Sequence, residues 1–170
     1  MDLKNIPFGE PEAFNVIIEI PEGSNQKFEY DEASGEMRVN FVFKDLVFPF
    51  NYGFIANTLG GDGDALDAIV LSSAPLESGE VLKCKAVGVL KTLDRGEVDD
   101  KIICVSLSDK LSEKYQDIPD LPPDSLQKWT DFYMEVARQK EKTVEILDLK
   151  NKQEALVEIK KSIKKTSIAG

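Results

Sequence analysis

Hydrophobic and polar residues alternate through most of the first two-thirds of the chain, a pattern typical of half-buried β-strands. Turn signals such as Pro21 and Ser34-Gly35 separate the alternating segments. Pro49 limits ladder pairing in one aromatic-rich segment, and Gly88 predicts a bulge or bend in the longest one. We expect strands at residues 14–20, 26–30, 36–43, 48–55, 68–71, 81–93 and 101–107.

The hydrophobic period becomes helical after Pro122-Pro123-Asp124, where Asp124 is expected to cap a helix. The following stripe is interpreted as core packing against a sheet and comprises Leu126, Trp129, Phe132, Tyr133, Val136 and Ala137. A short strand at 143–149 and a terminal helix with Leu156, Ile159 and Ile163 on one face complete the chain. We therefore expect a single α+β, mainly β domain over 1–170, a small barrel with helices packed outside.

Composition narrows the chemistry that this domain can perform. The 170 residues include no histidine, which excludes Ser-His-Asp triads and His-ligated zinc. A net charge of −10 argues against a nucleic-acid partner, and the lysine-rich run at 160–165 is interpreted as a solvated helix face. Cys84 and Cys104 lie in apolar segments without metal-site spacing, so we expect reduced thiols in a cytoplasmic protein. No signal peptide or membrane-spanning run is recognised.

The main candidate site is the acidic segment at 61–68, which contains Asp62, Asp64 and Asp67. Carboxylates this close repel one another unless a cation lies between them, and Mg²⁺ is the usual cation for an all-oxygen cluster. A hydrated acidic turn at a strand entrance is the simpler alternative. A calcium-binding loop is excluded because its fifth and twelfth positions would be Leu66 and Ser73. A sugar-nucleotide-binding motif stays open.

A second acidic segment, residues 94–101, joins two expected strands and contains Asp94 and Asp99. Alone, it is an ordinary exposed turn around Gly96. Both acidic segments lie at strand ends, however, so they could face each other across the mouth of a barrel.

These motifs resemble family I soluble inorganic pyrophosphatases, a Mg²⁺-dependent family. The resemblance covers about residues 10 to 120 and rests on the order and spacing of several motifs. These are Asp62-Gly-Asp64-Ala-Leu-Asp67, Glu19-Ile-Pro21, Lys27-Phe-Glu29, Ser34-Gly35, Phe48-Pro-Phe-Asn-Tyr52-Gly53, Gly88-Val-Leu-Lys91 and the segment 94–101. It implies an OB-like five-stranded barrel with flanking helices, often assembled as a homo-hexamer, that hydrolyses pyrophosphate by metal-activated water.

The resemblance also implies roles for the acidic residues. Asp62, Asp67 and Asp99 would hold Mg²⁺, with Mn²⁺ as an alternative, and Asp67 would also reach a second ion. Asp94 and Asp99 would bind a metal that arrives with the substrate. Asp64 would take a proton from the attacking water.

Four further residues would act on the substrate by the same resemblance. Lys27, Tyr52 and Lys101 would hold phosphate oxygens, and Glu29 would act through water on another metal. Charge-assisted contacts of this kind suit the oxygens of a highly charged phosphoanhydride.

The chain departs from the family at two phosphate-binding positions. Phe41 stands where the family has an arginine, and Arg38, three residues earlier, is expected to point to the other face of its strand. Either Phe41 is simply a core residue, or it marks the position of a phosphate-binding arginine that this chain has lost. In the second case Phe41→Arg should speed phosphate release.

The late helix holds the second departure. Val136-Ala137 replaces the family's Tyr-Lys pair, although a shifted alignment offers Tyr133-Met134. Nearby cations are Arg138, Lys140 and Lys142. Two alternatives to the pyrophosphatase therefore stay open. One is a divergent paralogue with weak activity or another phosphoanhydride substrate, and the other is a metal-dependent binding module.

Overall fold

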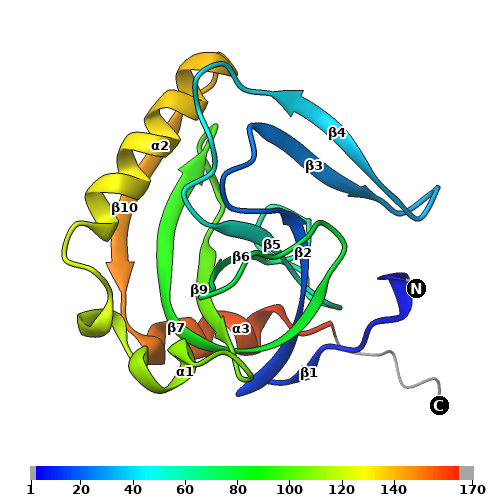
Figure 1. The fold of residues 1–170 in the computed structure, drawn as a ribbon, viewed down its shortest axis with the longest axis vertical. Helices are drawn as coiled ribbons and strands as arrows, with labels where there is room; N and C mark the ends of the chain where they lie inside the picture. The colour runs from blue at the N-terminus through cyan, green and yellow to red at the C-terminus, as the bar shows by residue number, and fades with distance from the viewer. Residues whose placement is uncertain (1–2, 165–170) are drawn as a thin grey trace.

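The structure, a computed structural model, describes residues 3–164 and is built around a closed barrel of five strands. Hydrogen bonding runs in the order β2-β5-β6-β9-β7, and β2 also pairs with β7, which closes the ring (Figure 1). Only β6 and β9 of this ring run parallel. The barrel strands are β2 (Ala13–Ile20), β5 (Asn51–Ile55), β6 (Asp67–Leu71), β7 (Val81–Asp94) and β9 (Lys101–Ser106). The predicted mainly β barrel is confirmed.

Five larger elements surround the barrel (Figure 1). A separate hairpin projects from one side, β10 extends the sheet at β7, one helix packs on β10 and another packs on β7. They are β3 (Gln26–Asp31), β4 (Glu36–Val42), α2 (Ser125–Gln139), β10 (Val144–Lys150) and α3 (Lys152–Ser162). All of these were expected from the sequence to within a few residues.

The short elements were not expected, since they are too brief to have a hydrophobic period. They are a 3₁₀ turn at Leu3–Asn5, β1 (Gly9–Glu10), β8 (Glu97–Val98), α1 (Leu111–Lys114) and a 3₁₀ turn at Ile118–Asp120. No helix in residues 3–164 is long and apolar enough to cross a membrane.

Alternate residues of the barrel strands face two different hydrophobic cores. In β9, Ile102 and Cys104 belong to the core that α3 covers, whereas Ile103 and Val105 belong to the core that α2 covers. Lys101 has the parity of Ile103, so its side chain lies on the α2 side. The alternation of side chains along each strand thus determines which charged residues at the strand ends lie on the α2 side of the barrel.

Three local predictions have definite outcomes. The bulge expected near Gly88 is confirmed, since the β7–β9 register shifts between Ala86 and Gly88. Asp124 occupies the N-cap position of α2, but its side chain makes no capping hydrogen bond, so that part of the prediction is wrong. Lys160 and Lys161 are exposed on α3 as expected, while Lys165 lies outside the described residues.

The core predictions also hold in most positions. Cys84 and Cys104 are buried free thiols in strands. The α2 stripe is buried at four positions, Trp129, Phe132, Tyr133 and Val136. Leu126 is exposed instead, although it belongs to the same hydrophobic stripe.

Candidate active site

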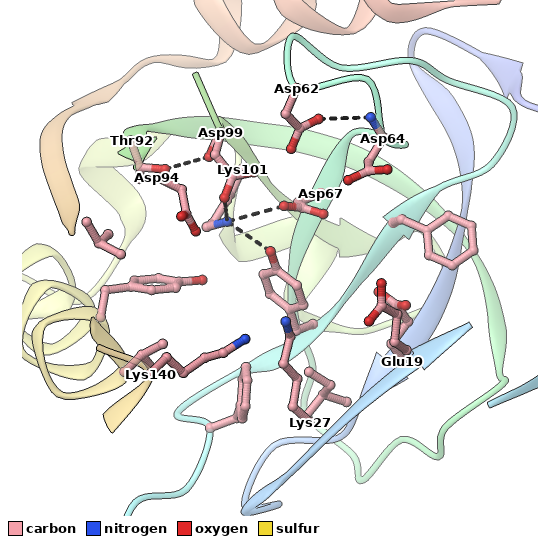
Figure 2. Close-up of a pocket in the computed structure, with 18 of the residues that line it drawn as sticks. Glu19, Lys27, Asp62, Asp64, Asp67, Thr92, Asp94, Asp99, Lys101 and Lys140 are labelled. Carbon is pink, nitrogen blue, oxygen red and sulfur yellow. Dashed lines mark hydrogen bonds and ion pairs between the residues drawn. The ribbon is translucent and has the colours of Figure 1, made fainter. Parts of the chain in front are cut away.

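A cavity of about 620 Å³ opens between the barrel, the β3–β4 hairpin and the C-terminal end of α2. All nine residues proposed from the sequence line it, although they come from segments that are far apart in the chain. They are Lys27, Glu29, Tyr52, Asp62, Asp64, Asp67, Asp94, Asp99 and Lys101. Figure 2 shows the aspartates on one side of this space and the Lys27 and Lys140 ammonium groups on the other. We call these two sides the acidic wall and the basic wall.

The loop before β6 presents Asp62 and Asp64 at the cavity mouth. Gly63 between them has a φ of 88°, a left-handed conformation that glycine adopts without steric cost. The Asp64 backbone N–H donates to Asp62 Oδ1 at 3.0 Å, which closes a tight turn. Both aspartates are exposed, so their carboxylates can reach solvent or a ligand.

The base of the acidic wall is an ionic cluster around Lys101. Asp67 and Lys101 begin the parallel neighbours β6 and β9 and are register partners, so their side chains leave the sheet together. Lys101 Nζ lies 3.2 Å from Asp67 Oδ2 and 3.1 Å from Asp99 Oδ2, and it donates to the Tyr52 hydroxyl at 2.9 Å. Lys101 is only 3% exposed. A buried ammonium is thus stabilised by two carboxylates and a phenol oxygen.

The carboxylates of this wall are close enough to affect one another's ionisation. Burial raises the pKa of Asp67 to about 7, with Lys101 opposing and Asp99 reinforcing the shift. Burial also raises the pKa of Asp62, and Asp99 and Asp64 add to this effect. Burial favours neutral Asp99 as well, but Lys101 and hydrogen bonding with Asp67 outweigh it and lower the pKa of Asp99. The single positive charge of Lys101 therefore does not offset the repulsion among Asp62, Asp67 and Asp99.

The acidic wall suits a hard divalent cation by its donor chemistry. Its ligating atoms are carboxylate oxygens, and their mutual repulsion would be relieved by positive charge. Within residues 3–164, however, no group of three or more such side chains already converges on one point. Lys101 lies between Asp67 and Asp99, within ion-pair distance of both.

The second acidic segment forms the β7–β8 turn, with Arg95 and Gly96 at φ of 51° and 81°. Asp94, at the end of β7, faces the cavity and pairs with Lys142 at 2.6 Å. Asp99 is positioned by its backbone N–H, which donates to the Thr92 carbonyl at 3.0 Å. The two acidic segments therefore do face each other, as the sequence suggested.

Asp100 is a structural neighbour of this site. It is buried, and it pairs with Lys91 at 3.0 Å, on the side of β7 that α3 covers. Lys91 also pairs with Glu158 of α3 at 3.0 Å. The consecutive residues Asp99 and Asp100 thus point to opposite sides, one to the cavity and one to the helix.

The structure clarifies the two departures from the family pattern. A register shift in the β3–β4 hairpin leaves Asn40 as an extra residue, so Arg38 pairs with Glu29 and Phe41 pairs with Lys27. Simple alternation, used to place Arg38 on the other face, therefore does not hold across this bulge. Arg38 is nonetheless absent from the cavity lining, because its guanidinium turns to Asp31 at 3.0 Å.

In α2, Tyr133 and Val136 line the cavity, whereas Met134 is 41% exposed and Ala137 does not line it. The Tyr133 ring lies beside the Lys101 ammonium, with 5.3 Å from Nζ to the ring centroid. Burial raises the pKa of the Tyr133 hydroxyl, even though Lys101 opposes the shift. The helix therefore supplies a tyrosine to the site, but at Tyr133, about one turn before Val136, where an alignment without gaps places the family's tyrosine.

Several lining residues received no role from the sequence, namely Glu19, Thr92, Arg95, Lys140 and Lys142. Glu19 is the clearest of these, since burial raises its pKa to about 7 and Asp67 adds to the shift. The sequence did contain a signal for Glu19, because it is a charged residue within the otherwise apolar strand β2. Lys140 and Lys142 had no such signal, because lysines are common at the ends of helices.

Comparison with known proteins gives one consistent family. A family model described as inorganic pyrophosphatase matches residues 16–167. The inorganic pyrophosphatase of Campylobacter jejuni is 39% identical over 170 residues, which cover 96% of this chain and 98% of that protein. The soluble inorganic pyrophosphatase of Oryza sativa subsp. indica is 37% identical over 156 residues, 91% of this chain and 73% of the relative.

Solved structures agree with the sequence comparisons. The inorganic pyrophosphatase of Thermus thermophilus superposes with a TM-score of 0.87 at 36% identity, covering 94% of this chain and 95% of that one. The protein from Neisseria gonorrhoeae gives a TM-score of 0.88 at 32% identity, with 96% and 97% of the chains covered. The likeness thus extends over the whole barrel and its flanking helices.

Proposed function

This chain belongs to the inorganic pyrophosphatase family, and we propose that it hydrolyses pyrophosphate to two phosphates with the help of a divalent metal, Mg²⁺ or in its place Mn²⁺. The observation that carries this proposal is one cavity with an acidic wall opposite a basic wall. Pyrophosphate is too anionic to approach bare carboxylates, whereas a cation on the acidic wall and ammonium groups opposite it would match both sides.

The residues that would hold the metal are Asp62, Asp67, Asp94 and Asp99, all on the acidic wall. A divalent ion supplies Lewis acidity and offsets the charge of the substrate. The protein's own part is to keep these carboxylates ionised and adjacent, which Lys101 helps to do by its contacts with Asp67 and Asp99.

Asp64 is the proposed general base that accepts a proton from the attacking water. It is exposed at the cavity mouth and, unlike Asp67 and Asp99, has no ammonium group within ion-pair distance in the described part of the chain. The absence of histidine from the chain leaves this role to a carboxylate.

Lys27, Tyr52, Lys101 and Glu29 are the proposed substrate-binding residues. The Lys101 ammonium already donates to the Tyr52 hydroxyl, so the two present adjacent hydrogen-bonding groups to one region of the cavity. Lys27 reaches the cavity from the hairpin on the opposite side. Glu29 is exposed and accepts from Asn40 Nδ2 at 2.9 Å, which leaves it able to act through water.

Phosphate release tests the function directly. Pyrophosphate, a nucleoside triphosphate and tripolyphosphate are each supplied with Mg²⁺, with Mn²⁺ and with chelator. We expect release from pyrophosphate only when a divalent ion is present. Release from another phosphoanhydride alone would indicate the divergent paralogue, and metal binding without any release would indicate the binding module.

We also propose that residues 1–170 act as one domain, assemble as a homo-hexamer and work in the cytoplasm without nucleic-acid or membrane partners. The buried free thiols of Cys84 and Cys104 support a reducing compartment. Sedimentation velocity measures the state of assembly, and a monomer over the micromolar range would contradict the hexamer.

Cell fractionation tests the proposed location, and the protein should be recovered in the cytoplasmic fraction.

A further inference from the structure

The turn between α2 and β10 aims two lysines at the cavity. Glu141 has a φ of 51°, and the hydrogen bonds from the backbone N–H groups of Lys140 and Lys142 to Val136 and Ala137 close the helix end around it. Gln139 anchors this end to the segment after β4 through two hydrogen bonds with the Lys44 backbone, at 2.9 and 2.8 Å. Lys140 is therefore held against the β3–β4 hairpin.

The Lys140 ammonium lies over Phe41, with 5.6 Å from Nζ to the ring centroid. Phe41 is the register partner of Lys27, and the Lys27 and Lys140 ammonium groups point toward the same part of the cavity (Figure 2). Partial burial lowers the pKa of Lys140 to about 8, with repulsion from Lys27 and Lys142 adding to the effect. Like charges are thus gathered here, as on the acidic wall but with the opposite sign.

In the described part of the chain, two cations of the basic wall lack an ion-pair partner, although Glu19 is near enough to Lys27 for the lysine to oppose the rise in the pKa of Glu19. Lys142 is paired with Asp94, but within residues 3–164 no carboxylate lies within 4.0 Å of the ammonium groups of Lys27 or Lys140. Arg95 adds further positive charge near Lys140. An anion in the cavity would relieve this repulsion.

A separate feature also points to a ligand in this space. Tyr133 is 8% exposed and lines the cavity, and its buried hydroxyl finds no hydrogen-bond partner of ordinary geometry among the described residues, although Tyr52 lies close enough to affect its pKa. A buried hydroxyl without a partner costs free energy, which a ligand oxygen would recover.

We propose that Lys140 is a substrate-binding residue whose ammonium, held over Phe41 beside Lys27, binds a phosphate group, with the Tyr133 hydroxyl as an additional donor. This inference rests on the proposed pyrophosphatase function and adds the residues that hold the anion. Lys140 supplies from α2 the positive charge that the chain lacks at Phe41. The neighbouring arginines do not compete for this role, because Arg38 is paired with Asp31 and exposed Arg138 with Glu135.

The test compares Lys140→Met with Lys140→Arg and Arg138→Met in the full chain. Methionine keeps an apolar stem over Phe41 but removes the charge, arginine keeps the charge, and Arg138 at the same helix end is the matched control. Calorimetric titration with inorganic phosphate in the presence of Mg²⁺ measures anion binding without turnover. KM and kcat for pyrophosphate are measured in parallel, together with the melting temperature.

We expect Lys140→Met to weaken phosphate binding and raise KM by about tenfold, the size of a charge-assisted hydrogen bond at a half-exposed site. Lys140→Arg should recover most of the loss, and Arg138→Met should show none. Equal phosphate affinity and KM in Lys140→Met and Arg138→Met would overturn the inference, as would a lack of phosphate binding by the unsubstituted chain. Weakened phosphate binding in Lys140→Met without any pyrophosphate hydrolysis by the unsubstituted chain would support the anion site and reject the proposed function.

Discussion

The two walls of the cavity carry opposite charge and are built in different ways. The acidic wall comes from loops at the ends of barrel strands, and two of its carboxylates, Asp67 and Asp99, share a buried internal cation, Lys101. The basic wall comes from a hairpin and a helix end that meet only in the folded chain, and its cations Lys27 and Lys140 lie beside an aromatic ring.

This difference indicates two ways to keep like charges together. The charges of the acidic wall lie in or beside loops at the ends of hydrogen-bonded strands, and Lys101 partly neutralises Asp67 and Asp99 from within. The basic wall depends on long flexible side chains, so its geometry can adapt to an anion at a cost in side-chain entropy. We expect substitutions on the acidic wall to affect catalysis and metal binding, and those on the basic wall to affect mainly substrate affinity.

The largest effect is expected for Asp64→Asn, which keeps the shape of the side chain and removes its basicity. If Asp64 accepts the proton of the attacking water, kcat should fall by roughly 10²- to 10⁴-fold. Steady-state phosphate release measures this change. Asp45→Asn is the control, because Asp45 is exposed, is not part of the cavity lining and has a left-handed conformation that asparagine tolerates. Unchanged turnover in Asp64→Asn would eliminate this residue as the base.

Asp67→Ala should remove the stabilisation that a divalent metal gives to the fold. A ligand at a hundred times its Kd stabilises the native state by about 2.7 kcal/mol, so Mg²⁺ should raise the melting temperature of the unsubstituted chain by several degrees. The variant should lose most of that increase. Thermal unfolding with Mg²⁺ and with chelator measures both, and an identical metal response in the two proteins would reject Asp67 as a ligand.

Tyr133→Phe should separate binding from stability on the side of the cavity that α2 forms. Because the hydroxyl has no partner of ordinary geometry in the described residues, its removal should leave the melting temperature unchanged or slightly higher. Phosphate affinity should nevertheless fall by roughly three- to tenfold. Tyr115→Phe, at a buried tyrosine outside the cavity lining, is the matched control. A clear loss of stability with unchanged phosphate affinity would show a packing role instead.

The smallest effect is expected for Phe41→Arg in the unsubstituted chain. From the sequence this change should speed phosphate release, but the structure places Lys27 and Lys140 next to residue 41. A third cation would be repelled there and would lose the aromatic contact with Phe43, at 4.8 Å between ring centroids. The arginine should improve KM only in the Lys140→Met background. A gain of equal size in both backgrounds would mean that Lys140 and residue 41 act independently.

Most of the fold was predictable because its long strands and helices carry clear hydrophobic periods. The strand at Ala13–Ile20 and the helix at Ser125–Gln139 were both expected within a few residues. The bulge in the β3–β4 hairpin was not, since nothing around Asn40 distinguishes an extra residue from regular alternation. One such residue changes the cross-strand partner of Arg38, and therefore where its side chain can reach.

The sequence alone determined the barrel, the acidic wall and the absence of imidazole chemistry. Local features carry that information, because Asp62, Asp64 and Asp67 are neighbours in one loop and Asp94 and Asp99 are neighbours in another. The family resemblance assigned Lys27 and Lys101 to the site, but only the tertiary structure decided that Lys140 joins them opposite the carboxylates. Lys27, Lys101 and Lys140 are separated by dozens of residues, and each resembles an ordinary surface lysine in the sequence. Their meeting depends on strand pairing, on the end of α2 and on its contact with the hairpin, which are long-range contacts without a local hydrophobic or turn signal.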